Sequence, residues 1–288
     1  MTYNKVKLKE TIMKVVFFAA ACTSILAVAL ICVFLFVNGI PAMAEIGLPD
    51  FLLGKSWKPA DTPPSYGIFP MILGSIYVTA GAIILGVPVG LLTAVFMAKY
   101  CPERLYRILK PGINLLAGIP SVVYGFFGMV VIVPFIRDIF GGTGTSMLTA
   151  SILLAIMILP TIINVSESAI RAVPEEYYQG SLALGATHER SLFSVVLPAG
   201  KSGIMAGIVL GIGRAIGETM AVIMVAGNQP RMPKGPLKGI RTLTANIVLE
   251  MGYAADLHRG ALIATGVVLF IFILIINLLL SLLKGRSE

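Results

Sequence analysis

An arginine and a glutamate lie inside an otherwise apolar stretch of this 288-residue sequence. Arg214 is near the middle of the run 202–226, and Glu218 follows four residues later, which would place both side chains on one face of a helix. A charge at the centre of a bilayer costs roughly 2.5–3.5 kcal/mol on insertion scales, so such residues usually mark a pathway. The guanidinium offers a fork of N–H donors that suits phosphate oxygens. We predict that Arg214 and Glu218 line a substrate pathway; the alternative is a structural pair that neutralises itself.

Other small or polar residues inside apolar runs are weaker candidates. Ser121 and Thr219 could contact a substrate, although such hydroxyl groups more often bond a neighbouring helix. Glu167 and Arg171, four residues apart, are predicted to form a structural pair at the membrane interface. Glycines at every fourth position are predicted to let two helices pack closely; they are Gly203, Gly207 and Gly211.

Nothing in the sequence indicates an enzyme active site. The three cysteines and two histidines form no cluster with metal-ligand spacing. Gly200-Lys201-Ser202 matches the end of the nucleotide-binding motif G-x-x-x-x-G-K-[ST], but Val195 stands where its first glycine is required. We therefore expect no catalytic residue, metal or cofactor in this chain, and any energy from ATP must come through another chain.

The composition indicates which elements hold these residues. The chain is 57% hydrophobic and 12% charged, with a mean hydropathy of +0.92, whereas soluble domains are about 25% charged. It contains six apolar runs of about the 20 residues that a spanning helix needs. They are 15–37, 71–98, 111–136, 147–170, 202–226 and 260–283. We predict an all-α membrane protein with six transmembrane helices.

Two regions are expected along the chain. Residues 1–70 would hold an anchor helix at 15–37, too long for the 7–15 apolar residues of a signal peptide, and an extracytoplasmic segment rich in proline and glycine. Residues 71–283 would form a body of five helices.

Basic residues predict that both termini are cytoplasmic. With that orientation, thirteen lysines and arginines fall in cytoplasmic segments and eight in external ones, in line with the usual excess of basic residues in cytoplasmic loops. The net charge of +8 is scattered between apolar runs, which favours membrane loops over a nucleic-acid surface.

The segment 174–198 is predicted to form two short helices on the cytoplasmic face. Pro174 followed by two glutamates is typical of a helix start, and Gly185 would break the helix in two. The simplest alternative is a solvated connector between two membrane helices.

This segment resembles the loop by which binding-protein-dependent ABC importers contact their ATPase. The family pattern is E-A-A, three residues, G, nine residues, then I-x-L-P; here Gly185 supplies the glycine and Val195-Val196-Leu197-Pro198 the end. The E-A-A positions fall on Gln179-Gly180-Ser181, which do not match. The resemblance implies a type I (MetI-like) transmembrane fold and ATPase docking at these positions.

Two further motifs resemble the phosphate-specific permeases of this family. They are Ala117-Gly118-Ile119-Pro120-Ser121-Val122-Val123-Tyr124-Gly125 and Gly211-Ile212-Gly213-Arg214-Ala215-Ile216-Gly217-Glu218-Thr219. The resemblance implies phosphate import with a second permease subunit, two ATPase subunits that bind ATP and Mg, and an extracytoplasmic phosphate-binding protein. A permease for sulfate or molybdate is the alternative. A self-sufficient secondary transporter fits less well, because it has no use for an ATPase dock and would be expected to contain an internal repeat.

Overall fold

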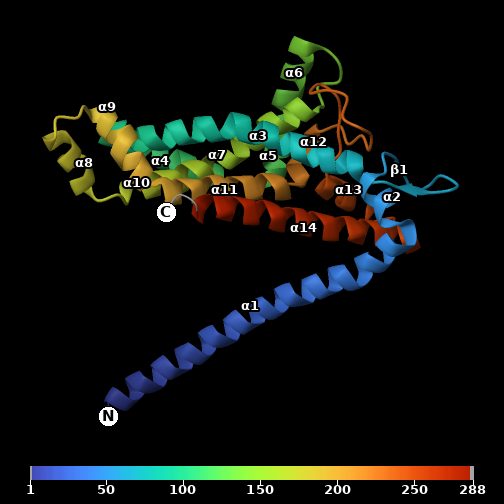
Figure 1. Ribbon diagram of the computed structural model, residues 1–288, viewed down its shortest axis with the longest axis horizontal. Coiled ribbons are helices and arrows are strands. Elements are labelled where there is room, and N and C mark those ends of the chain that lie inside the picture. Colours follow the sequence, from blue (N-terminus) through green and yellow to red (C-terminus); the bar gives the residue numbers. More distant parts are fainter. Residues whose placement is uncertain (1, 286–288) are drawn as a thin grey trace.

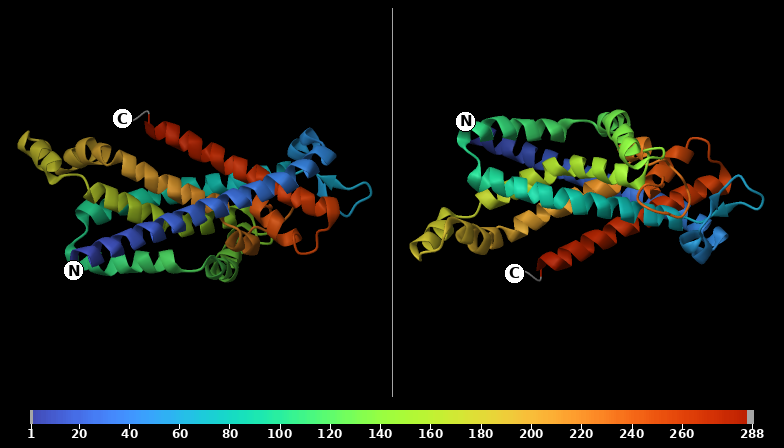
Figure 2. Two further views of the ribbon diagram at one scale, coloured as in Figure 1. Left: turned by 90° about the horizontal axis from the view of Figure 1, so that it is seen from below. Right: turned by 90° about the horizontal axis from the view of Figure 1, so that it is seen from above.

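The structure, a computed structural model, describes residues 2–285 and the side chains of residues 9–278. It is built almost wholly of helices, which confirms the predicted fold class. The long helices α3, α7, α11 and α14 run side by side, with α8 and α9 at one end of the bundle and two short strands at the other (Figures 1 and 2). We call these the α8 end and the β1 end.

The elements alternate between long helices and short connecting pieces. The first half comprises α1 (Thr2–Ile46), α2 (Leu48–Leu53), β1 (Trp57–Lys58), β2 (Ser65–Tyr66), α3 (Phe69–Val95), the π-helical turn η1 (Phe96–Tyr100), α4 (Glu103–Gly118), α5 (Ser121–Phe127), η2 (Gly128–Ile132) and α6 (Val133–Phe140). The second half comprises α7 (Met147–Arg171), α8 (Glu175–Ala183), α9 (His188–Ser191), η3 (Leu192–Val196), α10 (Leu197–Ala199), α11 (Lys201–Gly217), α12 (Met220–Val225), α13 (Leu243–Glu250) and α14 (Asp256–Gly285).

In the described part of the chain, five helices are long and apolar enough to cross a membrane. They are Lys9–Ile46, Phe69–Tyr100, Ser121–Phe140, Met147–Arg171 and Asp256–Leu278. A sixth span results if His188–Ala199 and Lys201–Gly217, which meet at a bend of 70°, are counted as one. The chain is therefore a multi-pass membrane protein.

Helix α7 forms the centre of the body and is the most buried of these spans. A Cβ added to Gly207 of α11 would lie 3.0 Å from Ser166 Oγ of α7, and one added to Gly211 would lie 2.8 Å from Ile162 Cγ1. Gly203 faces Ala169 in the same way. The glycine stripe therefore packs α11 against α7, as its spacing predicts.

The range 111–136 is not the single helix that its hydropathy predicts. Helix α4 ends at Gly118, Ile119 is extended, and α5 begins at Ser121. Proline at 120 has no N–H to continue the helix and biases the residue before it towards extended backbone. The break separates a helix with no fully buried residue, α4, from α5, which packs on α12.

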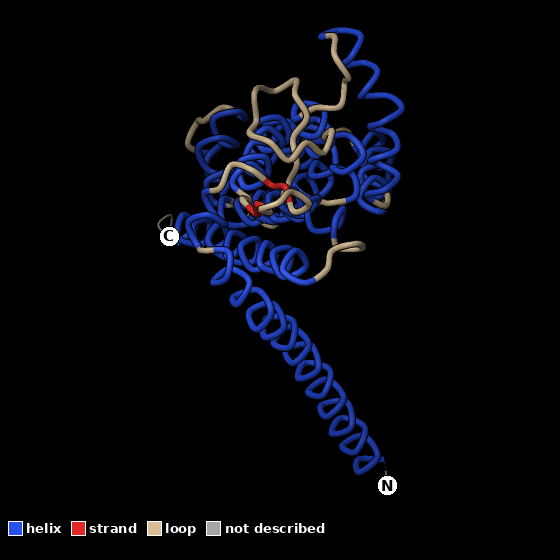
Figure 3. Tube along the Cα trace, turned by 90° about the vertical axis from the view of Figure 1, so that its right-hand side faces the viewer, coloured by secondary structure: helices blue, strands red, loops and turns tan. Residues whose placement is uncertain are grey.

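The first helix is longer than the predicted 15–37 and leaves the bundle towards its N-terminus (Figures 1 and 3). Its C-terminal part packs on α14, where a Cβ on Gly39 would lie 2.7 Å from Val267. The segment after it contains α2 and an antiparallel hairpin in which Trp57 pairs with Tyr66.

Candidate functional site

Arg214 lies in the last turn of α11, half-buried. None of the residues whose side chains the structure describes forms a hydrogen bond or ion pair with its guanidinium. An arginine inside a membrane helix without an acceptor is costly unless a ligand or partner supplies one.

The prediction that Glu218 lies on the same helical face as Arg214 is wrong. Helix α11 ends at Gly217, and Glu218 has extended backbone with φ −70° and ψ 130°. Its carboxylate accepts hydrogen bonds from the N–H groups of Thr219 and Ala221, both at 3.1 Å. Acidic side chains favour such positions because they satisfy the free N–H groups at a helix start. Glu218 therefore caps α12.

The predicted span 202–226 is thus two helices with an unwound link between them. The link is held by Thr244, whose hydroxyl donates to the Glu218 carbonyl at 3.1 Å. Thr219 lies in the link, half-buried, and Ser121 lies half-buried at the start of α5. Unwound backbone at membrane depth is tolerated only where protein or water satisfies it, and here the Thr244 hydroxyl supplies one such partner.

One side of α11 near Arg214 is open. A Cβ on Gly213 or Gly217 would meet no atom within 4 Å, and Leu210 is exposed. The described chain does not cover this side of α11, so the side is free to contact lipid or another subunit.

The segment 174–198 forms the two short helices that the sequence predicts. Between them Gly185 adopts φ +85°, a left-handed conformation that suits glycine. The hairpin is fixed by a Ser181–Ser191 hydroxyl hydrogen bond of 2.9 Å and by Tyr178 Oη against His188 Nδ1 at 2.5 Å.

The residues predicted to dock on an ATPase take different positions on this segment. Gln179, Gly180, Gly185 and Pro198 are exposed, whereas Ser181 and Leu197 are half-buried. Leu197 packs against a cluster of apolar residues at the root of the segment; its buried members are Ala94, Ile170, Leu192 and Val196. Leu184 is 92% exposed at the tip. Exposed apolar side chains next to an ordered turn are typical of a contact surface.

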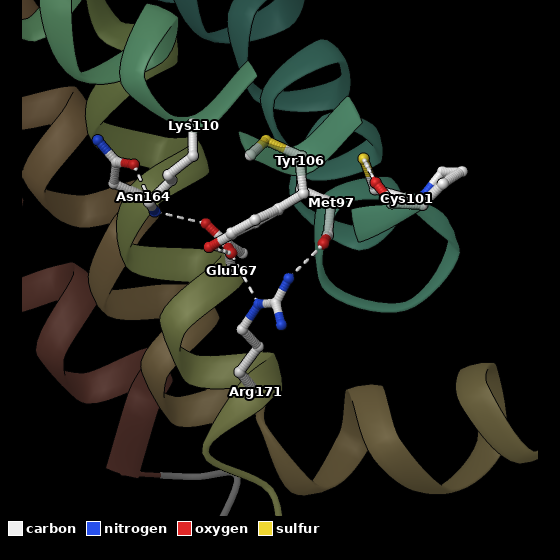
Figure 4. A network of polar contacts seen from close by, with 8 residues as sticks. Met97, Cys101, Tyr106, Lys110, Asn164, Glu167 and Arg171 are labelled. Atoms are coloured by element: carbon white, nitrogen blue, oxygen red, sulfur yellow. Dashed lines mark hydrogen bonds and ion pairs between the residues drawn. The ribbon is translucent and has the colours of Figure 1, made fainter. Parts of the chain in front are cut away.

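A cluster around Glu167 was not predicted in this form (Figure 4). The carboxylate is 1% exposed and accepts hydrogen bonds from Lys110 Nζ at 2.5 Å, Tyr106 Oη at 2.8 Å and Arg171 Nε at 2.7 Å. Lys110 also donates to Asn164 Oδ1 at 2.9 Å. The sequence indicates the Glu167–Arg171 pair, but the two donors from α4 lie 57 and 61 positions away and only the fold brings them in.

An ion pair joins the bundle to α8. Lys99 Nζ of η1 lies 3.3 Å from Glu175 Oε2, in the first turn of α8, and 5.3 Å from the centre of the Tyr178 ring. The start of α8 is therefore paired with η1, the turn that follows α3.

At the β1 end, Glu250 of α13 is 6% exposed and joins distant parts of the chain. It accepts hydrogen bonds from Trp57 Nε1 at 2.8 Å and from Arg241, and His258 Nε2 lies 2.9 Å from it. Burial raises the pKa of the adjacent Tyr66, and the carboxylate of Glu45 adds to the rise. This cluster anchors the hairpin to α13, to the loop before α13 and to the start of α14.

The structure brings together no metal site among its described residues, where no three His, Cys, Asp or Glu side chains converge.

Comparison with known proteins identifies the class. The sequence family described as binding-protein-dependent transport system inner membrane component matches residues 86–287 of this chain. The chain belongs to this family.

Particular relatives are similar over most of their length. The probable ABC transporter permease protein YqgH of Bacillus subtilis (strain 168) is 39% identical over 94% of this chain and 89% of its own. The phosphate transport system permease protein PstC of Mesorhizobium japonicum is 32% identical over 96% of this chain and 90% of its own. PstC of Xylella fastidiosa (strain 9a5c) is 35% identical over 83% and 80%, respectively.

Solved structures show the same fold. A chain of the MetNI methionine ABC transporter in an inward-facing conformation aligns with a TM-score of 0.58 at 21% identity, over 77% of this chain and 94% of that chain. A chain of a bacterial alginate ABC transporter, in complex with a pentasaccharide-bound periplasmic protein, aligns with a TM-score of 0.58 at 14% identity, over 92% and 94%. The fold is therefore that of ABC importer permeases.

Proposed function

We propose that this chain is the PstC-type permease subunit of an ATP-driven importer that carries inorganic phosphate across the cell membrane. The observation that carries the proposal is the 32% identity to PstC of Mesorhizobium japonicum over 96% of this chain. Arg214 supports it, because its guanidinium has no acceptor among the described residues and phosphate oxygens are acceptors that fit its donors.

The unwound link beside Arg214 would form part of the pathway wall. Ser121 at the start of α5, which packs on α12, would offer a hydroxyl donor, and Thr219 in the link would do so on leaving the Gly217 carbonyl, to which it donates at 3.3 Å. Glu218 would shape this wall by capping α12 rather than by pairing with the arginine.

Three kinds of partner complete the importer in this proposal. A PstA-like permease would cover the open side of α11, where Gly213 and Gly217 meet no atom. A dimer of PstB-like ATPases, which would hold ATP and Mg, would dock on the segment 174–198. A PstS-like phosphate-binding protein would deliver the ion at the β1 end.

The α8 end would face the cytoplasm and the β1 end the outside, with both termini cytoplasmic. The excess of basic residues in the segments that this orientation places inside supports it. Single cysteines labelled with an impermeant reagent test it: residues in 38–70 should react from outside intact cells, and residues in 175–195 should not.

The substrate is tested with the four-component complex in proteoliposomes. Uptake of labelled phosphate should require ATP on the side of the membrane that holds the ATPase subunits. It should also require the phosphate-binding protein on the opposite side. Sulfate and molybdate should neither be carried nor compete. Preferential uptake of either ion would overturn the phosphate assignment while leaving the permease role intact.

A further inference from the structure

We propose that Glu167 is a positioning residue for transport, which makes α4 follow the end of α7 when the segment 174–198 moves. The inference rests on the proposed function, because that segment is where ATP hydrolysis would act. It adds a residue and a route that the family resemblance does not assign.

The cluster is joined directly to the segment at the α8 end. Arg171 is the last residue of α7, and its Nη2 donates to the Met97 carbonyl of η1 at 2.7 Å (Figure 4). Lys99, two residues after Met97 in η1, pairs with Glu175 at the start of α8. A displacement of α8 therefore pulls on η1 and on the end of α7 together.

The same cluster is joined in the other direction to the neighbourhood of Arg214. Lys110 and Tyr106, which hold Glu167, belong to α4. At the far end of α4, the Leu116 carbonyl accepts a 2.8 Å hydrogen bond from Tyr124 Oη across the break at Pro120. Tyr124 belongs to α5, which packs on α12, the helix that follows the link beside Arg214. Movement of α4 would therefore change the wall beside the arginine.

Helix α4 has little else to hold it in the described chain. Only one of its faces is half-buried, and it contains Tyr106, Leu109, Lys110 and Ile113. Apolar contacts along so narrow a face would let α4 slide against α7. The three hydrogen bonds to the Glu167 carboxylate instead fix both the distance and the orientation of the groups that they join. Separating them would leave a buried charge without partners. The carboxylate thus links the two helices as a rigid tie.

The quantity that tests this role is the number of phosphate ions imported per ATP hydrolysed. It is measured with the complete importer in proteoliposomes, for the wild type and for Glu167→Gln. We expect the ratio to fall by at least about fivefold, the low end of typical couplings between sites, while ATP hydrolysis by the assembled complex continues. Glu103→Gln is the matched control, because Glu103 pairs with Arg107 on the same helix but is 72% exposed. Its ratio should not change.

A milder variant covers the case in which Glu167→Gln does not assemble. Tyr106→Phe keeps the ring that lies 4.4 Å from the Arg171 guanidinium carbon but removes one donor to Glu167. It should assemble normally and show a smaller fall in the ratio. An unchanged ratio in Tyr106→Phe and in any assembled Glu167→Gln, or a loss of uptake that only follows the amount of complex, would overturn the inference. A wild type that carries another oxyanion would overturn the proposed substrate instead, and the ratio would be measured with that ion.

Discussion

The carboxylate of Glu218 accepts a hydrogen bond from the backbone N–H of Ala221 at 3.1 Å. It therefore caps the start of α12 and does not neutralise the charge of Arg214. The arginine is left without an acceptor among the described residues. Two side chains four positions apart therefore have separate roles: one shapes the unwound link, and the other, in the proposed function, binds the anion.

Replacement of Arg214 should impair transport more than assembly. We expect Arg214→Ala to lower phosphate uptake at least tenfold, since a hydrogen bond to a charged group contributes roughly 1.5–3 kcal/mol. Arg214→Lys should recover little, because an ammonium lacks the planar fork. Initial rates of labelled phosphate uptake, normalised to assembled complex, measure the effect. Wild-type rates in the lysine variant would show that only charge is required.

Glu218 should tolerate an amide but not an alanine. The amide oxygen of Glu218→Gln can still accept from the N–H groups of Thr219 and Ala221, whereas Glu218→Ala loses the cap, at a cost of about 1 kcal/mol. Thermal unfolding of the purified subunit should rank the wild type and the glutamine variant above the alanine variant. If both variants instead lose uptake equally with unchanged stability, the carboxylate acts on the substrate.

Gly185 should be required for docking on the ATPase. A leucine at φ +85° is strained by roughly 1–2 kcal/mol, so Gly185→Leu should distort the turn between α8 and α9. ATPase that co-purifies with the permease, and phosphate uptake, should both fall. Gly112→Ala is the control, because Gly112 lies outside the segment, in the helical backbone of α4, where a Cβ meets no atom within 4 Å. Full co-purification with Gly185→Leu would make the segment a connector only.

The sequence predicts the long helices because hydropathy and length report directly on burial in a membrane. It also predicts the break at Gly185, where a glycine stands between two polar helical stretches. The breaks at 118–120 and 217–219 lie inside apolar runs, and hydropathy does not respond to backbone direction. Pro120 is the signal that the sequence offers for the first break, because a proline biases the residue before it towards extended backbone, and Ile119 is extended.

The partners of Glu167 could not be found from the sequence. The i,i+4 spacing to Arg171 is local, whereas Lys110 and Tyr106 belong to α4. Helix α4 begins at Glu103, before the predicted span 111–136, so the sequence does not predict it as a separate helix. A glutamate inside a span needs hydrogen-bond donors, so the sequence indicates that Glu167 has such partners. Only the packing of α4 on α7 shows which residues they are.

The two sides of α11 should respond differently to added side chains. Gly207→Val would place atoms against Ser166 of α7, and overpacking of this kind costs typically 1–3 kcal/mol. The isolated subunit should therefore unfold at a lower temperature. A Cβ on Gly213 would meet no atom within 4 Å, so Gly213→Val should leave the subunit stable and lower only the yield of complex with the second permease. Equal yields of complex for Gly213→Val and the wild type would place that permease elsewhere.

The buried charge at the β1 end gives a prediction about stability that is independent of transport chemistry. Glu250 holds Arg241, Trp57 and His258 together, and Glu250→Leu would leave the arginine, 13% exposed, without its counter-charge. Removal of one partner of a buried pair costs roughly 3–5 kcal/mol, whereas apolar replacement of both is often near neutral. The double variant Glu250→Leu/Arg241→Met should therefore unfold closer to the wild type than the single variant does. Asp61→Asn is the control, because the Lys58–Asp61 pair in the same region is exposed and contributes about 0–1 kcal/mol. Thermal unfolding of the purified subunit in detergent provides the measurement. A double variant as unstable as the single one would mean that the contacts to Trp57 and His258, and not the charge pair, fix the hairpin to α13.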